Sequence, residues 1–334
     1  YMLFDWQWYM PCTSHDGDAT KVVSKLDMPR VIAYGKEKGV GVWVYVNQHA
    51  LMKQMHELFP LLHKWGVVGV KSGFVQYASH RWATWLHDMV RLAAENKLLI
   101  NIHDEFRPSG FSRTYPNLIG NESARGTEYE AFGGSKPFHT TLLPFNRLIG
   151  GPMDYTPGIF DTKLDFMGDL PHGQVQTTLA KQLALYVTLY SPLQMAADLV
   201  ENYEKHMDAF QFIKDVAVDW DDSKYIEAEP GDYITVARKA KGTGNWFVGG
   251  ITDENARTAN FTLDFLEPGK QYVATLYADG KDADYKENPT SYQIKKGIVT
   301  SKTKMSVKEA RSGGFALSLI EATPADKKAV KKWR

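Results

Sequence analysis

The sequence is short of several features that mark common classes of protein. Its single cysteine, Cys12, can form no internal disulfide, which excludes a disulfide scaffold. The 39 basic residues equal the 39 acidic residues and no basic stripe is present, so nucleic-acid binding is not indicated. The sequence contains no run of about 18 apolar residues, the length that a membrane-spanning helix requires, and no signal peptide is visible. Because the chain opens on Tyr1 inside an expected strand, we expect an upstream segment that would include any signal.

Signatures of several kinds of catalysis are also absent from the sequence. It contains no phosphate-binding loop, dinucleotide fingerprint, zinc-type Cys/His spacing or Gly-x-Ser-x-Gly turn, so serine or cysteine nucleophiles have no support. Aromatic residues, by contrast, make up 13% of the chain. Aromatic rings stack on the C–H faces of sugars, although they are equally good core material.

The first hundred residues alternate apolar strands with helices. Strands are expected at 1–9, 40–47, 66–75 and 97–102, and helices at 27–38, 51–65 and 78–96. Strands separated by helices of this length predict βαβ units and a parallel sheet. Polar residues gather where these strands end, as they do on the active face of a (β/α)8 barrel.

The second half of the chain changes character twice. Residues 107–169 are rich in glycine, proline and aromatic residues, with strand 140–149 expected among them, and helices are expected at about 174–190 and 203–216. Short alternating strands are then expected at 233–238, 245–251, 258–265, 272–278 and 314–321. We therefore predict an α/β fold: a (β/α)8 TIM-type barrel in residues 1–222, followed by a small antiparallel all-β domain in residues 223–334.

Three polar residues, His103, Asp104 and Glu105, directly follow the strand expected at 97–102. Neighbouring side chains on a strand point to opposite faces, so at most one of Asp104 and Glu105 would enter a barrel centre, unless the strand has already ended. The alternative is a surface pair of carboxylates beside a helix-capping histidine.

A second group of carboxylates lies in residues 121–130, which hold three glutamates and Arg125. Carboxylates crowded together must be paired, protonated or bound to a metal, and calcium suits them because it takes several oxygen ligands. The alternative is a charged helix start in which Glu122 and Arg125 form an i,i+3 pair.

A third segment, residues 150–158, is a rigid loop around Asp154 that either contacts a substrate or forms a structural turn. Paired carboxylates in an aromatic-rich barrel mouth fit glycoside hydrolysis. There one acid protonates the leaving oxygen and another carboxylate acts as base or nucleophile.

These segments resemble glycoside hydrolase family 97, and the resemblance extends over nearly the whole chain. It is carried by residues 5–9, 70–73, 107–118, 121–129 and 150–160. The most specific of these is the block 121–129, which reads NESARGTEY.

The resemblance implies a calcium-dependent enzyme that acts on α-glucosides or α-galactosides at non-reducing ends. Members of the family have an N-terminal β-sandwich, a (β/α)8 barrel and a C-terminal β domain. The present chain would then start at the second barrel strand, without the first strand and its helix. It would pack against an N-terminal β-sandwich that donates a calcium ligand. Relatives are mostly periplasmic or cell-surface proteins, which implies that localisation here.

Position by position, the resemblance also implies roles for the carboxylates. Glu128 matches the general acid that protonates the glycosidic oxygen. Asp104 matches the carboxylate that serves inverting members as base and calcium ligand, with Glu105 as the alternative if the alignment shifts by one. The calcium ligands expected in this chain are therefore Asp104, Glu122 and Glu128.

Two positions depart from the family pattern. Retaining members carry an aspartate nucleophile where this chain has Gly73, so double displacement lacks its nucleophile and an empty position would leave space for the water that inversion requires. Inverting members place a further glutamate base where this chain has Asn47, which cannot accept a proton. Asp104 or Glu105 would then do the base work alone.

Weaker matches concern the sugar itself. Four polar residues match positions near the sugar in relatives: Lys71, His103, His139 and Asp154. Trp6 and Trp8 would either stack on a sugar ring or plug the barrel.

The sequence thus predicts an exo-acting, calcium-dependent α-glycosidase that hydrolyses α-glucosides of an oligosaccharide with inversion. One alternative is an α-galactosidase of the same family whose nucleophile is removed or relocated. The other is a non-hydrolytic carbohydrate-binding protein, because the positions of Asn47 and Gly73 both lack the family's carboxylate.

Overall fold

The computed structural model describes residues 1–104, 106–132, 134–164 and 173–333. The chain divides into two compact units. The first unit comprises Tyr1–Ala124 and Gly150–Asp154, and the second comprises Arg125–Ile149 and Tyr155–Arg334. Each unit is described by itself.

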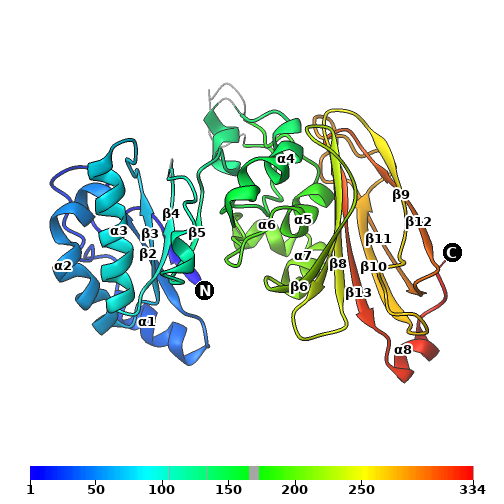
Figure 1. Ribbon diagram of the computed structural model, residues 1–334, viewed down its shortest axis with the longest axis horizontal. Coiled ribbons are helices and arrows are strands. Elements are labelled where there is room, and N and C mark those ends of the chain that lie inside the picture. Colours follow the sequence, from blue (N-terminus) through cyan, green and yellow to red (C-terminus); the bar gives the residue numbers. More distant parts are fainter. Residues whose placement is uncertain (105, 133, 165–172, 334) are drawn as a thin grey trace. The chain divides into compact units, whose positions relative to one another are not determined.

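The first unit is a parallel sheet covered by helices. Its five strands lie in the order of the chain: β1 (Met2–Phe4), β2 (Val42–Asn47), β3 (Gly69–Gly73), β4 (Leu99–Ile102) and β5 (Leu118–Asn121). All four neighbouring pairs are parallel. Helices α1, α2 and α3 lie on the same face of this sheet (Figure 1). This barrel-like arrangement confirms the predicted α/β fold class.

Local signals explain the boundaries of the three helices. Helix α1 (Met28–Glu37) is capped by Asp27, α2 (Gln48–Trp65) by Asn47, and α3 (His80–Glu95) by Ser79. In each case the capping side chain accepts a hydrogen bond from a backbone N–H of the first turn, which would otherwise lack a partner. The buried residues of α3 recur at helical spacing and pack on the sheet: Leu86, Met89, Val90 and Ala93.

The strand expected at 140–149 is wrong. The chain there forms α4 (Phe138–Leu142), followed by the 3-10 turns η3 (Leu143–Phe145) and η4 (Arg147–Gly150). The β-branched pair Thr140 and Thr141 favoured a strand, but their hydroxyls donate back to the carbonyls of Pro137 and Phe138, three residues earlier. Such bonds form only in a helical turn.

Among the described residues of the second unit, three α-helices follow α4 before the strands of the β domain begin. These are α5 (Leu179–Thr188), α6 (Val200–Glu204) and α7 (Met207–Asp215). The expected helices at 174–190 and 203–216 match α5 and α7, with shorter bounds. Every residue of α5 is buried, which is unusual for a helix and includes Lys181.

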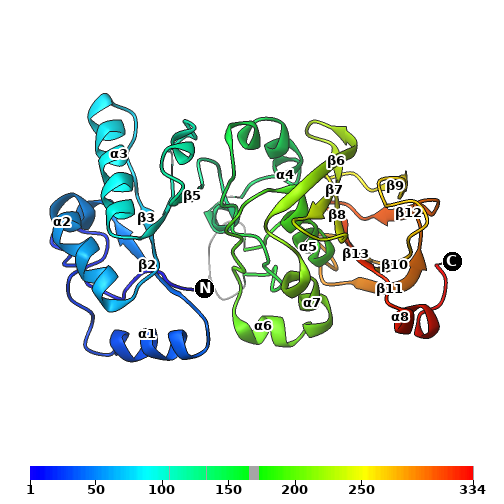
Figure 2. The ribbon, with the colours of Figure 1, turned by 60° about the horizontal axis from the view of Figure 1, so that its bottom comes forward.

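The all-β domain is a sandwich of unequal sheets. Its larger sheet has the antiparallel order β11 (Tyr292–Val299), β10 (Tyr272–Asp279), β13 (Gly314–Glu321), β8 (Trp246–Thr252), β7 (Tyr233–Ala240) and β6 (Trp220–Glu229). The smaller sheet pairs β12 (Lys304–Glu309) with β9 (Arg257–Thr262) and covers one face of the larger one (Figure 2). Helix α8 (Pro324–Ala329) follows β13. The five strands expected here are confirmed, whereas β6, β11 and β12 were not expected.

Alternation along the strands gives the larger sheet two buried faces. Phe247 and Tyr277 face the helices of the second unit, while Val248 and Leu276 belong to the core between the two sheets. A Cβ on Gly249 would lie 2.6 Å from the carbonyl oxygen of Ala184, so only glycine lets α5 approach β8 this closely.

Two further expectations concern domain limits and membranes. Strand β6 begins at Trp220, close to the expected boundary at 222/223, while the two compact units divide the chain elsewhere, so that boundary stays a prediction. Among the described residues, none of the helices combines the length and apolar character that a membrane span requires.

Candidate active site

Polar side chains of the first unit gather where its parallel strands end. Asp5 follows β1, Asn47 ends β2, Gly73 ends β3, and His103 and Asp104 follow β4. Because neighbouring strands are parallel, these carboxyl ends meet along one edge of the sheet. Strand β4 ends at Ile102 and Asp104 has a positive φ of 64°, so simple strand alternation no longer governs the side chains after it.

A buried aspartate holds His103 at this edge. The Nε2 atom of His103 lies 2.6 Å from Oδ2 of Asp154, and the same oxygen accepts a hydrogen bond of 2.7 Å from Nδ2 of Asn101. Asp154 is 2% exposed. Although burial opposes both shifts, the contact raises the pKa of His103 and lowers that of Asp154. The contact therefore favours an imidazolium that faces a carboxylate, and Asp154 reaches the site through His103.

Glu122 stands on the other side of the imidazole. Its Oε2 lies 3.4 Å from Nδ1 of His103 and accepts a 2.7 Å hydrogen bond from the backbone N–H of Asp104. The carboxylate of Asp104 in turn accepts from the N–H of Val75, at 2.9 Å. Glu122 is thus joined to Asp104 through the backbone of Asp104.

Lys71 and Trp6 lie at the same edge of the sheet. The ammonium of Lys71 is 2.7 Å from Oδ2 of Asp5, and its side chain is 12% exposed. Trp6 is 49% exposed, and its ring lies 6.2 Å from the ring of Tyr45. An exposed indole beside carboxylates can stack on a sugar. Trp8, by contrast, is buried and donates its indole N–H to the carbonyl of Tyr45, so it is a core residue.

The space beside Gly73 is filled, which corrects the expectation that it lies empty for a water molecule. A Cβ on Gly73 would come within 2.8 Å of the phenol oxygen of Tyr45 and closer still to its ring. Real Cβ atoms do not approach other atoms so closely. Glycine is therefore required at this position because the aromatic ring of the neighbouring strand occupies the room of a side chain.

The structure also gives Asn47 a physical role. Its Oδ1 accepts a 2.9 Å hydrogen bond from the N–H of His49 and caps α2, for which asparagine is among the best residues. Its Nδ2 donates to the phenol oxygen of Tyr45 at 3.2 Å. Asn47 thus starts a helix and orients a tyrosine at the point where inverting relatives were expected to carry a base.

Glu128 and His139 belong to the second unit. Glu128 lies in the 3-10 turn η2 (Thr127–Phe132) and is exposed, while Thr127 before it donates its N–H to the carbonyl of Tyr155. Nε2 of His139 lies 3.0 Å from the carbonyl oxygen of Arg125, and burial lowers the pKa of this histidine. Glu128 and Asp104 belong to different units, so their joint action as acid and base stays a prediction. Glu105 lies outside the described residues.

The residues of the first unit fit a calcium ion only in part. Asp104 and Glu122 carry oxygen donors, which suit this ion, and Glu122 is bound to the backbone N–H of Asp104. Calcium takes six to eight oxygen ligands, however, and the described residues contain no group of three His, Cys, Asp or Glu residues that could hold a metal. They provide at most part of a calcium shell, and no step of the reaction is assigned to it.

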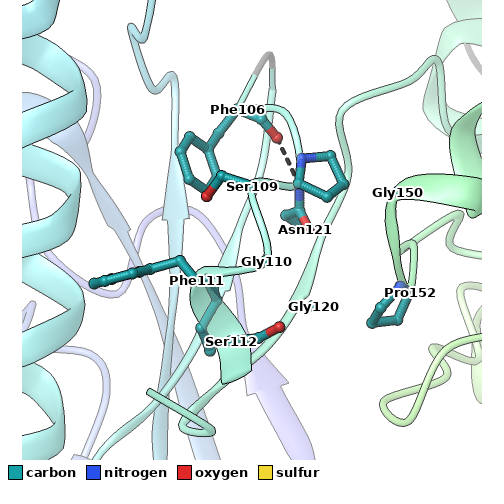
Figure 3. A pocket seen from close by; sticks show the side chains of 11 residues that line it. Phe106, Ser109, Gly110, Phe111, Ser112, Gly120, Asn121, Gly150 and Pro152 are labelled. Carbon is teal, nitrogen blue, oxygen red and sulfur yellow. Dashed lines mark hydrogen bonds between the residues drawn. The ribbon is translucent and has the colours of Figure 1, made fainter. Parts of the chain in front are cut away.

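A small pocket adjoins this cluster in the first unit. Its lining includes the rings of Phe106 and Phe111, the hydroxyls of Ser109 and Ser112, and Asn121 (Figure 3). The Nδ2 of Asn121 donates to the carbonyl of Phe106, drawn as the dashed line, and so holds the loop after β4 to the end of β5. All residues that line this pocket are uncharged, which suits a neutral ligand.

Sequence reasoning missed Tyr45, Asn101 and Asp5 as members of this site. A signal was available for the first two, because Tyr45 precedes Asn47 by two residues and Asn101 precedes His103 by two. Residues two apart on a strand share a face. A polar residue two positions before Asn47 or His103 was therefore a candidate for the same face.

A parallel sheet with histidine and carboxylates at its carboxyl edge, followed by an antiparallel β domain, is the architecture of barrel-type glycoside hydrolases. Two family models agree with it. Residues 1–124 match the model described as glycoside hydrolase 97, and residues 219–320 match the model described as "Glycosyl-hydrolase 97 C-terminal, oligomerisation". Together they match more than half of the chain. The chain belongs to glycoside hydrolase family 97.

Individual relatives carry the same assignment. The chain is 32% identical over 329 residues to a retaining α-galactosidase of Bacteroides thetaiotaomicron, covering 96% of this chain and 48% of that protein. It is 29% identical to a probable retaining α-galactosidase of Streptomyces bingchenggensis, covering 95% of this chain and 46% of that protein. The chain thus spans about half the length of the curated relatives it matches.

A solved structure provides the comparison of folds. It is a family 97 enzyme of Pseudoalteromonas sp. strain K8 in complex with acarbose, with 38% sequence identity and a TM-score of 0.87. The match covers 95% of this chain and 53% of that one. A further structure of that enzyme contains panose. The fold of this chain is therefore that of a family whose structures hold oligosaccharides.

Proposed function

We propose that the whole protein is an exo-acting, calcium-dependent α-glycosidase that hydrolyses α-glucosides at non-reducing ends with inversion. Glu128 protonates the leaving oxygen, and Asp104 takes a proton from the attacking water. Glu105 is the alternative base. The His103–Asp154 pair and Lys71 position the sugar, together with His139 and the ring of Trp6.

The observation that carries the proposal is the pairing of Gly73 with Tyr45. A retaining enzyme of this family requires a nucleophilic carboxylate at the end of β3, but the ring of Tyr45 fills that room. The carboxylate of Asp104 is bound to the backbone N–H of Val75, two residues after Gly73. Asp104 is therefore our candidate for the base that activates a water molecule in place of a nucleophile. Family membership and the oligosaccharide complexes of the Pseudoalteromonas enzyme support a saccharide substrate.

Calcium and localisation are further parts of the proposal. Asp104, Glu122 and Glu128 would hold the ion together with ligands from an N-terminal β-sandwich. When bound, it would supply positive charge that stabilises the carboxylates and polarises the site. A periplasmic or cell-surface location rests on the resemblance to relatives.

Two other functions have an observation in their favour. The curated relatives are named retaining α-galactosidases, which favours an α-galactosidase with a relocated nucleophile. A non-hydrolytic sugar-binding protein is favoured by Asn47, whose amide serves a helix cap and a tyrosine rather than proton transfer. The exposed Glu128 is the observation against a pure binder.

The anomer formed first decides between these functions. The whole protein is incubated with an aryl α-glucoside or aryl α-galactoside and calcium, and proton NMR records the anomer before mutarotation. We expect β-glucose first. α-Glucose first would overturn inversion, galactose release alone would make the protein an α-galactosidase, and no release with measurable sugar binding would make it a binder.

A matched pair of variants tests the acid in the same assay. Glu128→Gln keeps the shape but cannot give up a proton, so turnover of an unactivated disaccharide should fall by about a hundredfold or more. Glu204→Gln, at an exposed position of α6, is the control. Full activity of Glu128→Gln would sink the assignment of the acid.

A further inference from the structure

The hydroxyl hydrogen of Tyr45 has no acceptor among the described residues. Oδ1 of Asn47 must face the N–H of His49, a donor, so its NH2 group faces the phenol at 3.2 Å. An amide NH2 can only donate, and the phenol oxygen therefore accepts this bond. The hydrogen of the phenol is left to donate elsewhere.

The phenol is held firmly in place. Tyr45 is 2% exposed, its backbone carbonyl accepts the indole N–H of Trp8 at 2.6 Å, and its ring lies against the backbone of Gly73. Lys71 adds a cation–π contact, with its ammonium 6.0 Å from the ring centroid. A buried side chain fixed from three sides points its hydroxyl in one direction, which is what a positioning group needs.

The hydroxyl of Tyr45 lies at the carboxyl end of β3. The phenol lies at Gly73, and the carboxylate of Asp104 is bound to the N–H of Val75, two residues further along the chain. A donor and an acceptor therefore flank the same strand end, one from β2 and one from the segment after β4. Burial, together with the charges of Asp5 and Asp104, raises the pKa of Tyr45, so the phenol keeps its hydrogen.

We propose that Tyr45 is a catalytic residue whose hydroxyl donates a hydrogen bond to the attacking water, while that water donates to Asp104. The inference rests on the proposed function. The water oxygen bonds to the anomeric carbon and gives one proton to Asp104, the glycosidic C–O bond breaks, and Glu128 protonates the leaving oxygen. The water uses one lone pair for Tyr45 and the other for the sugar, so it is oriented without losing its nucleophilic pair.

The test compares two tyrosines that lie close together. Tyr45→Phe keeps the ring over Gly73 and removes the unassigned donor, together with the oxygen that accepts from the Asn47 amide. Tyr9→Phe removes an equally buried hydroxyl whose hydrogen already goes to the carbonyl of Cys12, at 3.0 Å, and which accepts the N–H of Asn47. Both variants are made in the whole protein, and kcat, KM for an aryl α-glucoside, glucose affinity by calorimetry and melting temperature are measured.

We expect Tyr45→Phe to lower kcat by about tenfold or more, with KM and glucose affinity within about twofold of wild type. Tyr9→Phe should lower the melting temperature while kcat stays within about threefold. An unchanged kcat in Tyr45→Phe, with an active wild type, overturns the inference alone. So does a loss confined to KM and glucose affinity, which would make the hydroxyl a sugar ligand. A wild type that releases no sugar overturns the proposed function and, with it, the bound water.

Discussion

Each unit of the molecule buries a cluster of charged side chains, and the two clusters are balanced in different ways. In the first unit, Asp154 and His103 face one another at 2.6 Å, and the pair lies at the edge of the sheet where Asp104 and Glu122 also stand. Charge is matched by charge there, so the pKa of Asp154 falls although it is buried.

In the second unit, the buried charges of Lys181 and Asp279 are hydrogen-bonded to neutral partners. The ammonium of Lys181 donates to the carbonyls of Pro137 and Thr252 and to the hydroxyl of Ser312, at 2.8–3.2 Å. Burial lowers the pKa of Lys181 to about 8 and raises that of Asp279 to about 6. These contacts join α5 to the start of α4 and to the loops of the β domain.

The comparison shows that a perturbed pKa does not by itself identify an active site. Lys181 and Asp279 are strongly shifted, yet each is enclosed by hydrogen bonds that tie structure together. In the first unit Glu122 follows Asn121, which lines a pocket, and the charge of Asp104 acts on a phenol whose hydrogen has no acceptor among the described residues. The surroundings of a charged residue, rather than the size of its pKa shift, therefore distinguish a candidate functional residue from one that stabilises the fold.

The largest expected effect comes from breaking the cluster of the second unit. Lys181→Met removes an ammonium that serves three acceptors and leaves them buried and unmatched. We expect the free energy of unfolding to fall by about 3–5 kcal/mol, measured by urea unfolding. Lys136→Met, at an exposed position, is the control and should change it by less than about 0.5 kcal/mol. A loss as small as that of the control would show that α5 does not depend on this cross-link.

The next effect tests the cluster of the first unit. Asp154→Asn leaves the imidazole of His103 without its buried counter-charge, so we expect a loss of about 2–3 kcal/mol in unfolding free energy. Glycoside turnover of the whole protein should also fall by about tenfold or more, because His103 loses its orientation. Asp16→Asn, at an exposed position, is the matched control. Loss of stability with full turnover would make the first cluster structural, like the second.

The smallest expected effect is a pH dependence of stability that distinguishes the two clusters. Burial raises the pKa of Asp279 from 3.8 to about 6, so between these values the folded state binds more protons than the unfolded state. Its contribution to stability is complete below pH 3.8 and is lost as pH rises through about 6. Asp279→Asn should remove this slope in urea titrations at different pH values, whereas Asp264→Asn, which is exposed, should keep it.

Asp154 should show the opposite sign in the same titrations. Its lowered pKa means that its contribution is present above pH 3.8 and is lost as pH falls. Equal slopes for the Asp279→Asn and Asp154→Asn variants would contradict the difference between the two clusters.

Much of the first unit could be predicted from sequence because its signals are local. Asp27 and Ser79 cap helices within three residues of themselves, and the alternation of strands and helices indicates a parallel sheet. The strand expected at 140–149 failed because Thr140 and Thr141 have a preference that the helical turn around them overrides. The residue types alone could not show whether this segment forms a strand or a helix.

The sequence by itself determined the parallel sheet, the all-β domain, the family and the position of His103 and Asp104 at the end of a strand. Periodicity, caps and motifs depend on neighbours along the chain, and these are written in the sequence. Only the tertiary structure decided that Tyr45 occupies the room of a side chain at Gly73 and that Asp154 is the partner of His103. Those contacts join segments 28 and 51 residues apart in the sequence, and packing geometry rather than local pattern sets them.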